Sequence, residues 1–410
     1  MLLSKHRVTY SIIIALLIII FAAIAIFWAR GFKPNFRNGS IDRTGLIVAS
    51  SIPTGASVYL DDRLTSATDT NITFLDPKTY KVKISKDGYS TWQKEVEVRA
   101  DLATEIKALL FPLAPEIKPL TTTGAANPTV SPDNLKIVYG VSGQNGGAYL
   151  LFMQDRSFLF HQEVRLLAKN RPGFDFSKAT FIWNPNSKEL IARTSGQDDK
   201  VVANILIDSD KTEQEFKDIT GSLTNTLDSY QQDYIQRAQT LALTVPAEVK
   251  EATMGAEQVK VESQSRKSTK PSPSPKLNSS LSTSTLTPHP NPTGMIFSPD
   301  EEKILYKDKT GKNVVYDLKE KKQYTLPDFS DLFTISWYPD SQHLLIVQKD
   351  QIAIIEKDGT NKMVVFSGKF ENAQPGGGVF THPSGQRLII LTTLTQSDGT
   401  PTNLYSINLR

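Results

Sequence analysis

The longest apolar stretch of the chain lies at its start, between Val8 and Ala29. It contains no charged residue, and every position from Ile12 to Trp28 is apolar. As a helix it would span about 33 Å at about 1.5 Å per residue, enough to cross a hydrocarbon layer about 30 Å thick. Because a segment in that layer must satisfy its own backbone hydrogen bonds, the pattern predicts a transmembrane helix over residues 8–29.

Two other interpretations compete for this stretch. A cleaved signal peptide has a shorter apolar core that ends at a small-residue cleavage site. Ala23-Ile24-Ala25 has that small-x-small form, but the apolar run continues through Trp28 and would bury the scissile bond. A buried core helix seldom runs this long without a polar face. We therefore expect an uncleaved anchor.

The orientation of the anchor does not follow from its flanking charges. Lys5 and Arg7 precede the stretch, and Arg30 and Lys33 follow it, so the positive-inside rule does not choose a side. We expect residues 1–7 to be a cytoplasmic tail because of the domain that follows the anchor. The polar and basic residues 30–43 read as a juxtamembrane linker.

From Thr44 onward the hydrophobic pattern changes to an alternation of apolar and polar positions. Alternation with a period of two predicts half-buried antiparallel strands, with Lys and Glu outward. Turn signals such as Asp76-Pro77 and Asp87-Gly88 separate these strands. The expected strands are 45–50, 57–60, 71–75, 80–84 and 93–98. Together they predict a compact antiparallel β-sandwich over residues 44–110.

This segment resembles a PEGA domain. Pro53-Thr54-Gly55-Ala56 departs from the Pro-Glu-Gly-Ala turn of that family at one position. The strand 58–61 and the segment 80–89 also match the family in the expected order. Members of the family are extracytoplasmic and often follow a membrane anchor, so the resemblance implies a surface-exposed or wall-associated module. It supports a cytoplasmic N-terminus.

Residues 85–92 also resemble an Asp-box turn of glycan-binding propellers. Gly88 falls one position early for that motif, and only one copy is present. We therefore expect an ordinary hairpin turn, with Trp92 covering one end of the sandwich.

Beyond the proline-rich connector 111–119, a turn containing proline recurs before a short strand. The copies occupy residues 130–139, 183–192, 297–306, 337–346 and 380–390. A second hairpin follows several of them, which gives four antiparallel strands per unit. Such a unit cannot bury both of its faces alone, so the repeat predicts a closed ring, a β-propeller over residues 113–410. The turns are similar to the SPDG-like turns of TolB-type, WD-repeat-like propellers.

The repeat predicts five or six blades. Blades of about 40–45 residues fit residues 113–410 that many times once an insertion at about 246–293 is removed. Most of that insertion is Ser, Thr, Pro and Lys, a composition that predicts disorder because it can bury little apolar surface. Before it, Tyr230, Tyr234, Ala238 and Leu241 are spaced like one face of a helix.

Composition excludes several classes of function. The chain has 410 residues and a net charge of +3, too small a charge to argue for nucleic-acid binding. It contains no cysteine, so disulfides and thiolate zinc sites are excluded.

The histidines offer no pair spaced for metal binding. Two of them lie in the tail or in the insertion, and two lie in the repeated turns, where we expect exposed polar residues. They are His6, His161, His289, His343 and His382. No G-x-S-x-G nucleophile elbow occurs.

Three further stretches are rich in glycine or in acidic residues. Gly143 to Gly147 lacks the Lys-Ser/Thr of a phosphate loop and reads as a hairpin loop. Asp208 to Glu213 begins with calcium-like spacing but lacks the glycine at loop position six. Gln374 to Gly378 reads as a connection between blades.

The sequence thus predicts a mainly β protein: an anchor, a PEGA-like sandwich and a propeller. We expect a non-catalytic binding or scaffold protein of the cell envelope, with a protein, peptide or glycan partner. It has no predicted catalytic, metal or cofactor-binding residue, and its ligand-binding residues and oligomeric state are not predicted. The alternatives are a glycan lyase or hydrolase acting at the propeller axis, and a structural cell-wall tether.

Overall fold

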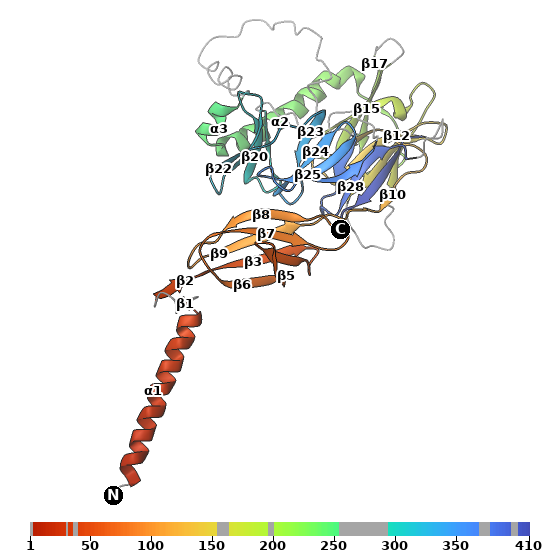
Figure 1. The fold of residues 1–410 in the computed structure, drawn as a ribbon. Coiled ribbons are helices and arrows are strands. Elements are labelled where there is room, and N and C mark those ends of the chain that lie inside the picture. Colours follow the sequence, from red (N-terminus) through yellow and green to blue (C-terminus); the bar gives the residue numbers. More distant parts are fainter. Residues whose placement is uncertain are drawn as a thin grey trace, which may run out of the picture. The chain divides into compact units, whose positions relative to one another are not determined.

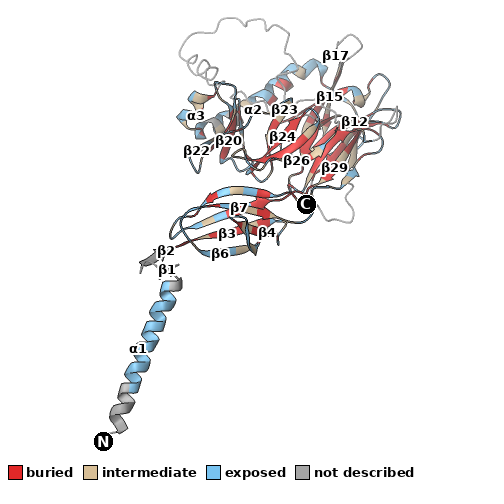
Figure 2. Cartoon of the chain, viewed as in Figure 1, coloured by how far each residue is buried: buried red, intermediate tan, exposed pale blue. Residues whose placement is uncertain are grey.

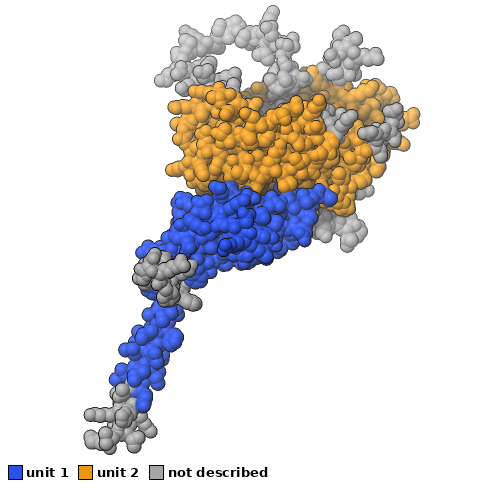
Figure 3. All heavy atoms as spheres, in the orientation of Figure 1, with its two compact units in different colours: residues 1–114 blue, residues 115–410 orange. Residues whose placement is uncertain are grey.

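The computed structural model describes residues 3–29, 32–35, 40–153, 164–195, 201–253, 294–368, 378–394 and 401–410. Most of the described residues beyond the first helix form β-strands (Figure 1). The chain divides into two compact units, Met1–Ala114 and Pro115–Arg410 (Figure 3).

The apolar stretch at the start of the chain forms one helix, α1 (Leu3–Ala29). Within the described residues, its segment Tyr10–Phe27 is the one stretch that is long and apolar enough to cross a membrane, and its side chains are exposed (Figure 2). The predicted helix is therefore confirmed.

The predicted linker contains regular structure. Strands β1 (Phe32–Asn35) and β2 (Ser40–Arg43) pair as an antiparallel hairpin, with Phe32 opposite Arg43. Sequence reasoning treated residues 30–43 as a plain linker, because four-residue strands with one proline carry little alternation.

The sandwich consists of two sheets. The first has the strand order β6-β3-β9 and the second β5-β4-β7-β8. The strands are β3 (Gly45–Ile52), β4 (Ser57–Leu60), β5 (Arg63–Ala67), β6 (Thr70–Leu75), β7 (Thr79–Ser85), β8 (Trp92–Glu97) and β9 (Ala103–Leu109). The five predicted strands are all present. The expected antiparallel pairing holds except for β3 and β9, which are parallel.

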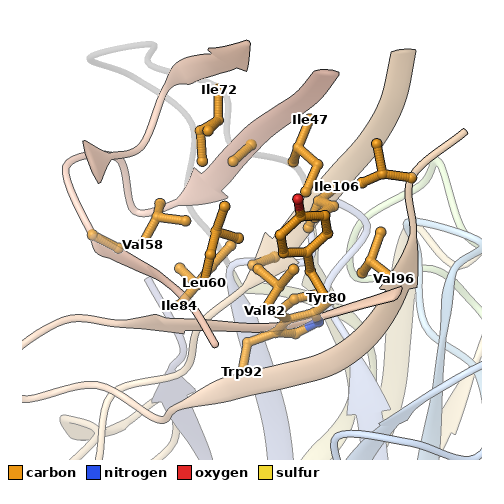
Figure 4. Packing of buried hydrophobic residues seen from close by; sticks show 14 of the residues in the cluster. Ile47, Val58, Leu60, Ile72, Tyr80, Val82, Ile84, Trp92, Val96 and Ile106 are labelled. Carbon is orange, nitrogen blue, oxygen red and sulfur yellow. The ribbon is translucent and has the colours of Figure 1, made fainter. Parts of the chain in front are cut away.

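The core of the sandwich lies between these two sheets (Figure 4). Alternate residues of β3 and β7 point inward, as the period of two predicts, and Ile47, Val82 and Ile84 are fully buried. Trp92 is buried in the same cluster. The hairpin interpretation of residues 85–92 therefore stands, since the Trp92 ring packs against aliphatic side chains.

The second unit contains five four-stranded antiparallel sheets in its described residues. The first two sheets consist of β11 (Ala126–Val130), β12 (Lys136–Val141), β13 (Gly147–Phe152) and β14 (Val164–Lys169), and of β15 (Ala179–Trp183), β16 (Glu189–Ser195), β17 (Val201–Asp208) and β18 (Lys217–Asp218). The next two consist of β19 (Met295–Phe297), β20 (Lys303–Lys307), β21 (Asn313–Asp317) and β22 (Lys322–Thr325), and of β23 (Leu332–Trp337), β24 (His343–Gln348), β25 (Gln351–Glu356) and β26 (Met363–Ser367). The fifth combines β10 (Ile117–Pro119) with β27 (Val379–Thr381), β28 (Arg387–Thr392) and β29 (Asn403–Asn408).

The fifth sheet joins the two ends of the unit. Strand β10 pairs with β29, so residues from the start of the unit complete the sheet formed at its end. Next to this pair, Asn403 Oδ1 accepts hydrogen bonds from Thr121 Oγ1 and the Gly124 amide, both at 3.0 Å. Asn403 Nδ2 donates to Pro401 O at 3.0 Å. The two ends of the unit are therefore joined by hydrogen bonds rather than by a covalent link.

The sheets form the blades of the propeller, and neighbouring blades pack face to face except the second and third. Separate apolar clusters join the first blade to the second, the third to the fourth, and the fifth to the first. The first strands β11 and β15 contact each other, as do β19 and β23, which places the first strands on the inner side of the ring. Of the two predicted blade numbers, the described residues form five.

A helical segment fills the space between the second and third blades. It consists of the short 3-10 helix η2 (Thr220–Ser222), α2 (Leu223–Thr244) and α3 (Ala247–Ala252). Leu227 and Tyr230 pack on the second blade, whereas Val245 and Val249 pack on the third. The apolar face of these helices thus covers two sheet faces that have no blade beside them. The other short helix, η1 (Phe176–Lys178), leads into β15.

The helix predicted from Tyr230, Tyr234 and Leu241 is confirmed, since all three lie in α2. The predicted insertion begins too early, however. Residues 247–252 form α3, and Val249 is fully buried, because its side chain covers the face of β20 and β21. Residues 254–293 lie outside the described residues. Their flanking residues meet, since a Cβ at Gly294 would lie 4.0 Å from Thr253 Cγ2.

We predict that Asn403→Ala lowers the free energy of unfolding by about 1–3 kcal/mol, because it leaves buried donors without their acceptor. Urea unfolding of the full chain in detergent measures the change, with the m-value expected to stay constant. The matched control is Asn225→Ala on the exposed face of α2, which should change stability by less than about 0.5 kcal/mol. Equal effects of the two substitutions would contradict the closing role of Asn403.

Candidate binding surface of the propeller

A six-residue turn links the first and second strands of every blade. We call it the blade turn, and its copies occupy residues 131–136, 184–189, 298–303, 338–343 and 382–387. In each copy the amide at position 1 donates to the carbonyl at position 6, at 2.8–3.0 Å, and the amide at position 4 donates to the carbonyl at position 1. Proline stands at position 2, where its fixed φ suits a turn.

Position 4 of the blade turn has a left-handed backbone in all five copies. The residues are Asn134, Ser187, Glu301, Ser341 and Gly385, with φ between 57° and 64°. Position 3 stabilises the turn with its side chain, which accepts a hydrogen bond from the amide at position 5, at 2.9–3.2 Å. This requirement explains why position 3 is Asp, Asn or Ser.

The blade turns also connect neighbouring blades. The Asp133 amide donates to Ser187 Oγ, and the Asp300 amide donates to Ser341 Oγ, both at 3.1 Å. The Tyr338 hydroxyl donates to the Gly385 carbonyl of the next blade. In these three cases the position-4 residue of one turn receives a hydrogen bond from the preceding blade. The repeat thus serves the packing of the ring.

Indole groups add a second connection between blades. Trp183 Nε1 donates to Thr129 O at 3.2 Å, and Trp337 Nε1 donates to Ile296 O at 2.8 Å. Both rings stand just before a blade turn and bond the inner strand of the preceding blade. An aromatic residue at this position of the repeat thus has a structural role.

Partly buried lysines near the blade turns are held by acceptors. Lys136 Nζ donates to Ser187 O and Ser209 Oγ, both at 2.9 Å. Lys303, although almost fully buried, pairs with Asp300 at 2.9 Å. These two ammonium groups therefore have structural partners.

A further ion-pair network links the third and fourth blades. Lys357 Nζ lies 2.6 Å from Asp317 Oδ2 and 2.8 Å from Glu320 Oε1. Burial alone would raise the pKa of the Asp317 carboxyl, but the Glu320 amide and the Lys357 ammonium outweigh it, so the pKa is lowered. The pKa of the Asp340 carboxyl is lowered in a similar way. Burial alone would raise it, but the His343 ring and two backbone amides outweigh burial.

His343 and His382 were predicted to be exposed turn residues, and this prediction is wrong. Their exposed fractions are 6% and 3%. His343 Nδ1 lies 2.7 Å from Asp340 Oδ2, and His382 Nδ1 lies 2.7 Å from Ser384 Oγ. A blade turn lies against the neighbouring blade, so ring packing buries polar positions that would be exposed in an isolated hairpin.

The other stretches considered in the sequence have structural roles where they are described. Gly143 and Gly146 form the tight turn between β12 and β13, as expected for a hairpin loop. Asp208 accepts the Asp210 amide and pairs with Lys211 at 3.0 Å. Among the described residues, no three His, Asp or Glu side chains are placed to hold a metal ion.

Some of the sequence candidates cannot be placed. His161, His289 and residues 374–377 lie outside the described residues, and nothing is described of the His6 side chain.

The inner strands give the propeller its clearest candidate surface. Strands β11, β15, β19, β23 and β27 pair on one side only, and none of them carries a charged residue. Ile296 of β19 and Phe333 of β23 are each 43% exposed on these strands. Such a surface offers exposed apolar side chains, and its strands carry no ionisable side chain.

Sequence reasoning did not find this surface. Strand β19 has only three residues, and Phe333 lies before its repeat motif, so neither forms part of a recognisable pattern. An available signal was the absence of charge in the residues just before each blade turn.

Comparison with known families identifies one domain. Residues 44–112 match the PEGA domain, which confirms the resemblance found in the sequence. No curated protein matches the chain.

Several solved structures are similar at very low identity. A structure described as TolB from Agrobacterium tumefaciens is 9% identical, with 90% of this chain and 99% of that chain covered and a TM-score of 0.20. The β-propeller domain of Cps50 (Swd1) from Myceliophteria thermophila is 11% identical, covering 70% and 72%, with a TM-score of 0.19. The tricorn protease is 7% identical, covering 78% of this chain and 26% of its own, with a TM-score of 0.19. The propeller assignment above rests on strand order and blade packing.

The lowered pKa values of Asp300, Asp317 and Asp340 predict acid sensitivity. A carboxyl with a lowered folded pKa stabilises the fold above its unfolded pKa, near 3.9, and this contribution is lost as pH falls through the folded pKa. Tm should therefore stay nearly constant above about pH 5 and fall below about pH 4.

Asp317→Asn separates this effect from general acid unfolding. It should lower Tm at pH 7 and make the loss of Tm below pH 4 shallower, because one of the titrating groups is gone. Asp328→Asn, at an exposed position, is the control and should leave the pH profile unchanged. A profile of Asp317→Asn that parallels the wild type would contradict the assignment.

Proposed function

We propose that this chain is a membrane-anchored, extracytoplasmic binding or scaffold protein of the cell envelope. In this proposal α1 spans the membrane with residues 1–7 in the cytoplasm, and the propeller is presented outside to a protein, peptide or glycan partner. The observation that carries the binding role is the uncharged inner surface of the ring with its exposed Ile296 and Phe333.

The location is supported by two features of the first unit. A helix long and apolar enough to cross a membrane precedes a PEGA domain, a combination compatible with a membrane-anchored or secreted protein. The anchor is preferred because the apolar run continues past its small-residue motif to Trp28.

The non-catalytic role is supported by the placement of ionisable groups. Hydrolysis or elimination at a glycan needs two acid-base groups that converge on the substrate. The described inner strands contain no such group, and the buried Asp317, Lys303 and His343 each have a structural partner. Measured turnover of an envelope glycan would overturn this part of the proposal.

The membrane topology can be tested directly, because the chain has no cysteine and any introduced thiol is unique. We expect Gln232→Cys, on the exposed side of α2, to react with a membrane-impermeant maleimide on intact cells. Lys5→Cys should react only after permeabilisation. The reverse pattern would contradict the orientation, and a soluble product lacking the first thirty residues would contradict the anchor.

Partner binding can be tested with a pair of substitutions at equal exposure. Phe333 lies on the inner strand β23, and Val364 lies on the outer strand β26, and both are 43% exposed. Phe333→Lys should reduce recovery of envelope partners by the full chain in nanodiscs about tenfold, the size expected for loss of a central apolar contact. Val364→Lys should leave recovery unchanged. Equal recovery with both variants would contradict binding at the inner surface.

A further inference from the structure

The hairpin β1–β2 shortens the connection between α1 and the sandwich. Fully extended, the chain from Ala29 to Gly45 could reach about 55 Å. The hairpin pairs Phe32 with Arg43. The distance from Ala29 to Gly45 is then at most about 22 Å. It is the sum of three extended residues before this pair, one step across the pair and two residues after it. The start of β3 is therefore held within about 22 Å of the end of α1.

Several segments of the sandwich meet at this start of β3. Gly45 lies opposite Leu75, the last residue of β6, and the Leu46 amide donates to Leu102 O, just before β9. The Asp101 amide donates to Thr44 O at 3.0 Å. We call the surface formed by residues 43–45, 73–76 and 99–102 the anchor-side end of the sandwich.

The anchor-side end exposes two large apolar side chains. Leu102 is 56% exposed, and Phe74 is 42% exposed. Phe74 lies in a β-bulge. Leu75 and Ile72 of β6 are three residues apart, whereas their partners on β3, Gly45 and Ile47, are two residues apart. Its φ of 59° is one that a bulky residue rarely adopts. A bulge of this kind turns a side chain away from the sheet, and here it removes a phenylalanine from the core.

Three ion pairs lie around these side chains. Asp101 pairs with Arg43 and Glu97 with Arg99, at 3.0 and 2.9 Å. On the neighbouring turn, Asp61 pairs with Lys78 at 2.7 Å. Carboxylates paired in this way do not repel anionic lipid headgroups as free ones would, and the arginine stems can lie along an apolar surface.

We propose that the anchor-side end of the sandwich rests on the lipid bilayer, with Phe74 and Leu102 inserted at the headgroup level. This inference rests on the proposed function, since it requires α1 to span the membrane. The bilayer is the partner because the covalent tether keeps this surface within reach of lipid at every moment. Exposed aromatic and aliphatic side chains with flanking arginines suit the membrane interface. The sandwich would then act as a docked base rather than a freely swinging stalk.

The test uses single cysteines in the full chain, reconstituted in vesicles of zwitterionic and anionic phospholipid. A small environment-sensitive fluorophore is attached at Leu102→Cys, and a nitroxide on phospholipid near the headgroup serves as quencher. Leu113→Cys, which replaces a residue 67% exposed beyond β9, is the matched control. Ile18→Cys, in the middle of α1, reports on the anchor, with nitroxide placed deep in the acyl chain.

We expect quenching at Leu102→Cys several times stronger than at Leu113→Cys, together with deep quenching at Ile18→Cys. Deep quenching at Ile18→Cys with equal, weak quenching at the other two sites would overturn the docking and leave the anchor intact. This outcome includes burial of Leu102 by a protein partner or a second copy, which would also keep nitroxide lipid away. Absence of quenching at Ile18→Cys would overturn the anchor and the docking with it.

A second substitution tests the role of Phe74. In the Leu102→Cys background, Phe74→Ser should weaken quenching, because it removes the other inserted side chain. Ile52→Ser, at the last residue of β3 and of comparable exposure, should leave the quenching unchanged. Both variants replace exposed side chains, so far-ultraviolet circular dichroism should match the parent. Equal quenching with Phe74→Ser and Ile52→Ser would overturn the inserted position of Phe74.

Discussion

Each sheet of the propeller is apolar on both faces and needs a packing partner on either side. All six residues of β24 are buried, as are five of the six in β25 and β28. A sheet of this kind exposes an apolar face wherever a neighbour is missing. Two further features complete the ring. Strand β10 completes the last blade, and α2 with α3 covers the faces that the second and third blades would otherwise expose.

The blade turn shows how one local sequence pattern serves this packing. Proline sets the start of the turn, a short polar side chain holds its amide, and a left-handed residue presents groups to the preceding blade. The same geometry accepts Asn, Ser, Glu or Gly at the left-handed position, so the repeat tolerates variation. The ionisable residues near the turns are bound in this framework. The inner strands carry no charge, and they expose Ile296 and Phe333.

Local patterns in the sequence predicted much of this architecture. Alternation identified the strands of the sandwich, and the spacing of Tyr230, Tyr234 and Leu241 identified α2, because both signals depend only on nearby residues. Pairings across long separations had no such signal. The parallel pairing of β3 with β9 and the closure of β10 on β29 follow from tertiary packing. His343 and His382 were misjudged for the same reason, since a neighbouring blade buries them. The candidate surface was missed because it consists of residues from five separate strands.

The meeting of Thr253 and Gly294 between α3 and β19 has a consequence for the chain that joins them. The ring already holds Thr253 and Gly294 close together, so the two ends of the joining segment are fixed whatever its length. Doubling the number of residues in such a loop costs only about 0.6 kcal/mol of closure entropy. This position can therefore accommodate a stretch of very different length or composition, or even a whole inserted module, while the surrounding blades keep their arrangement.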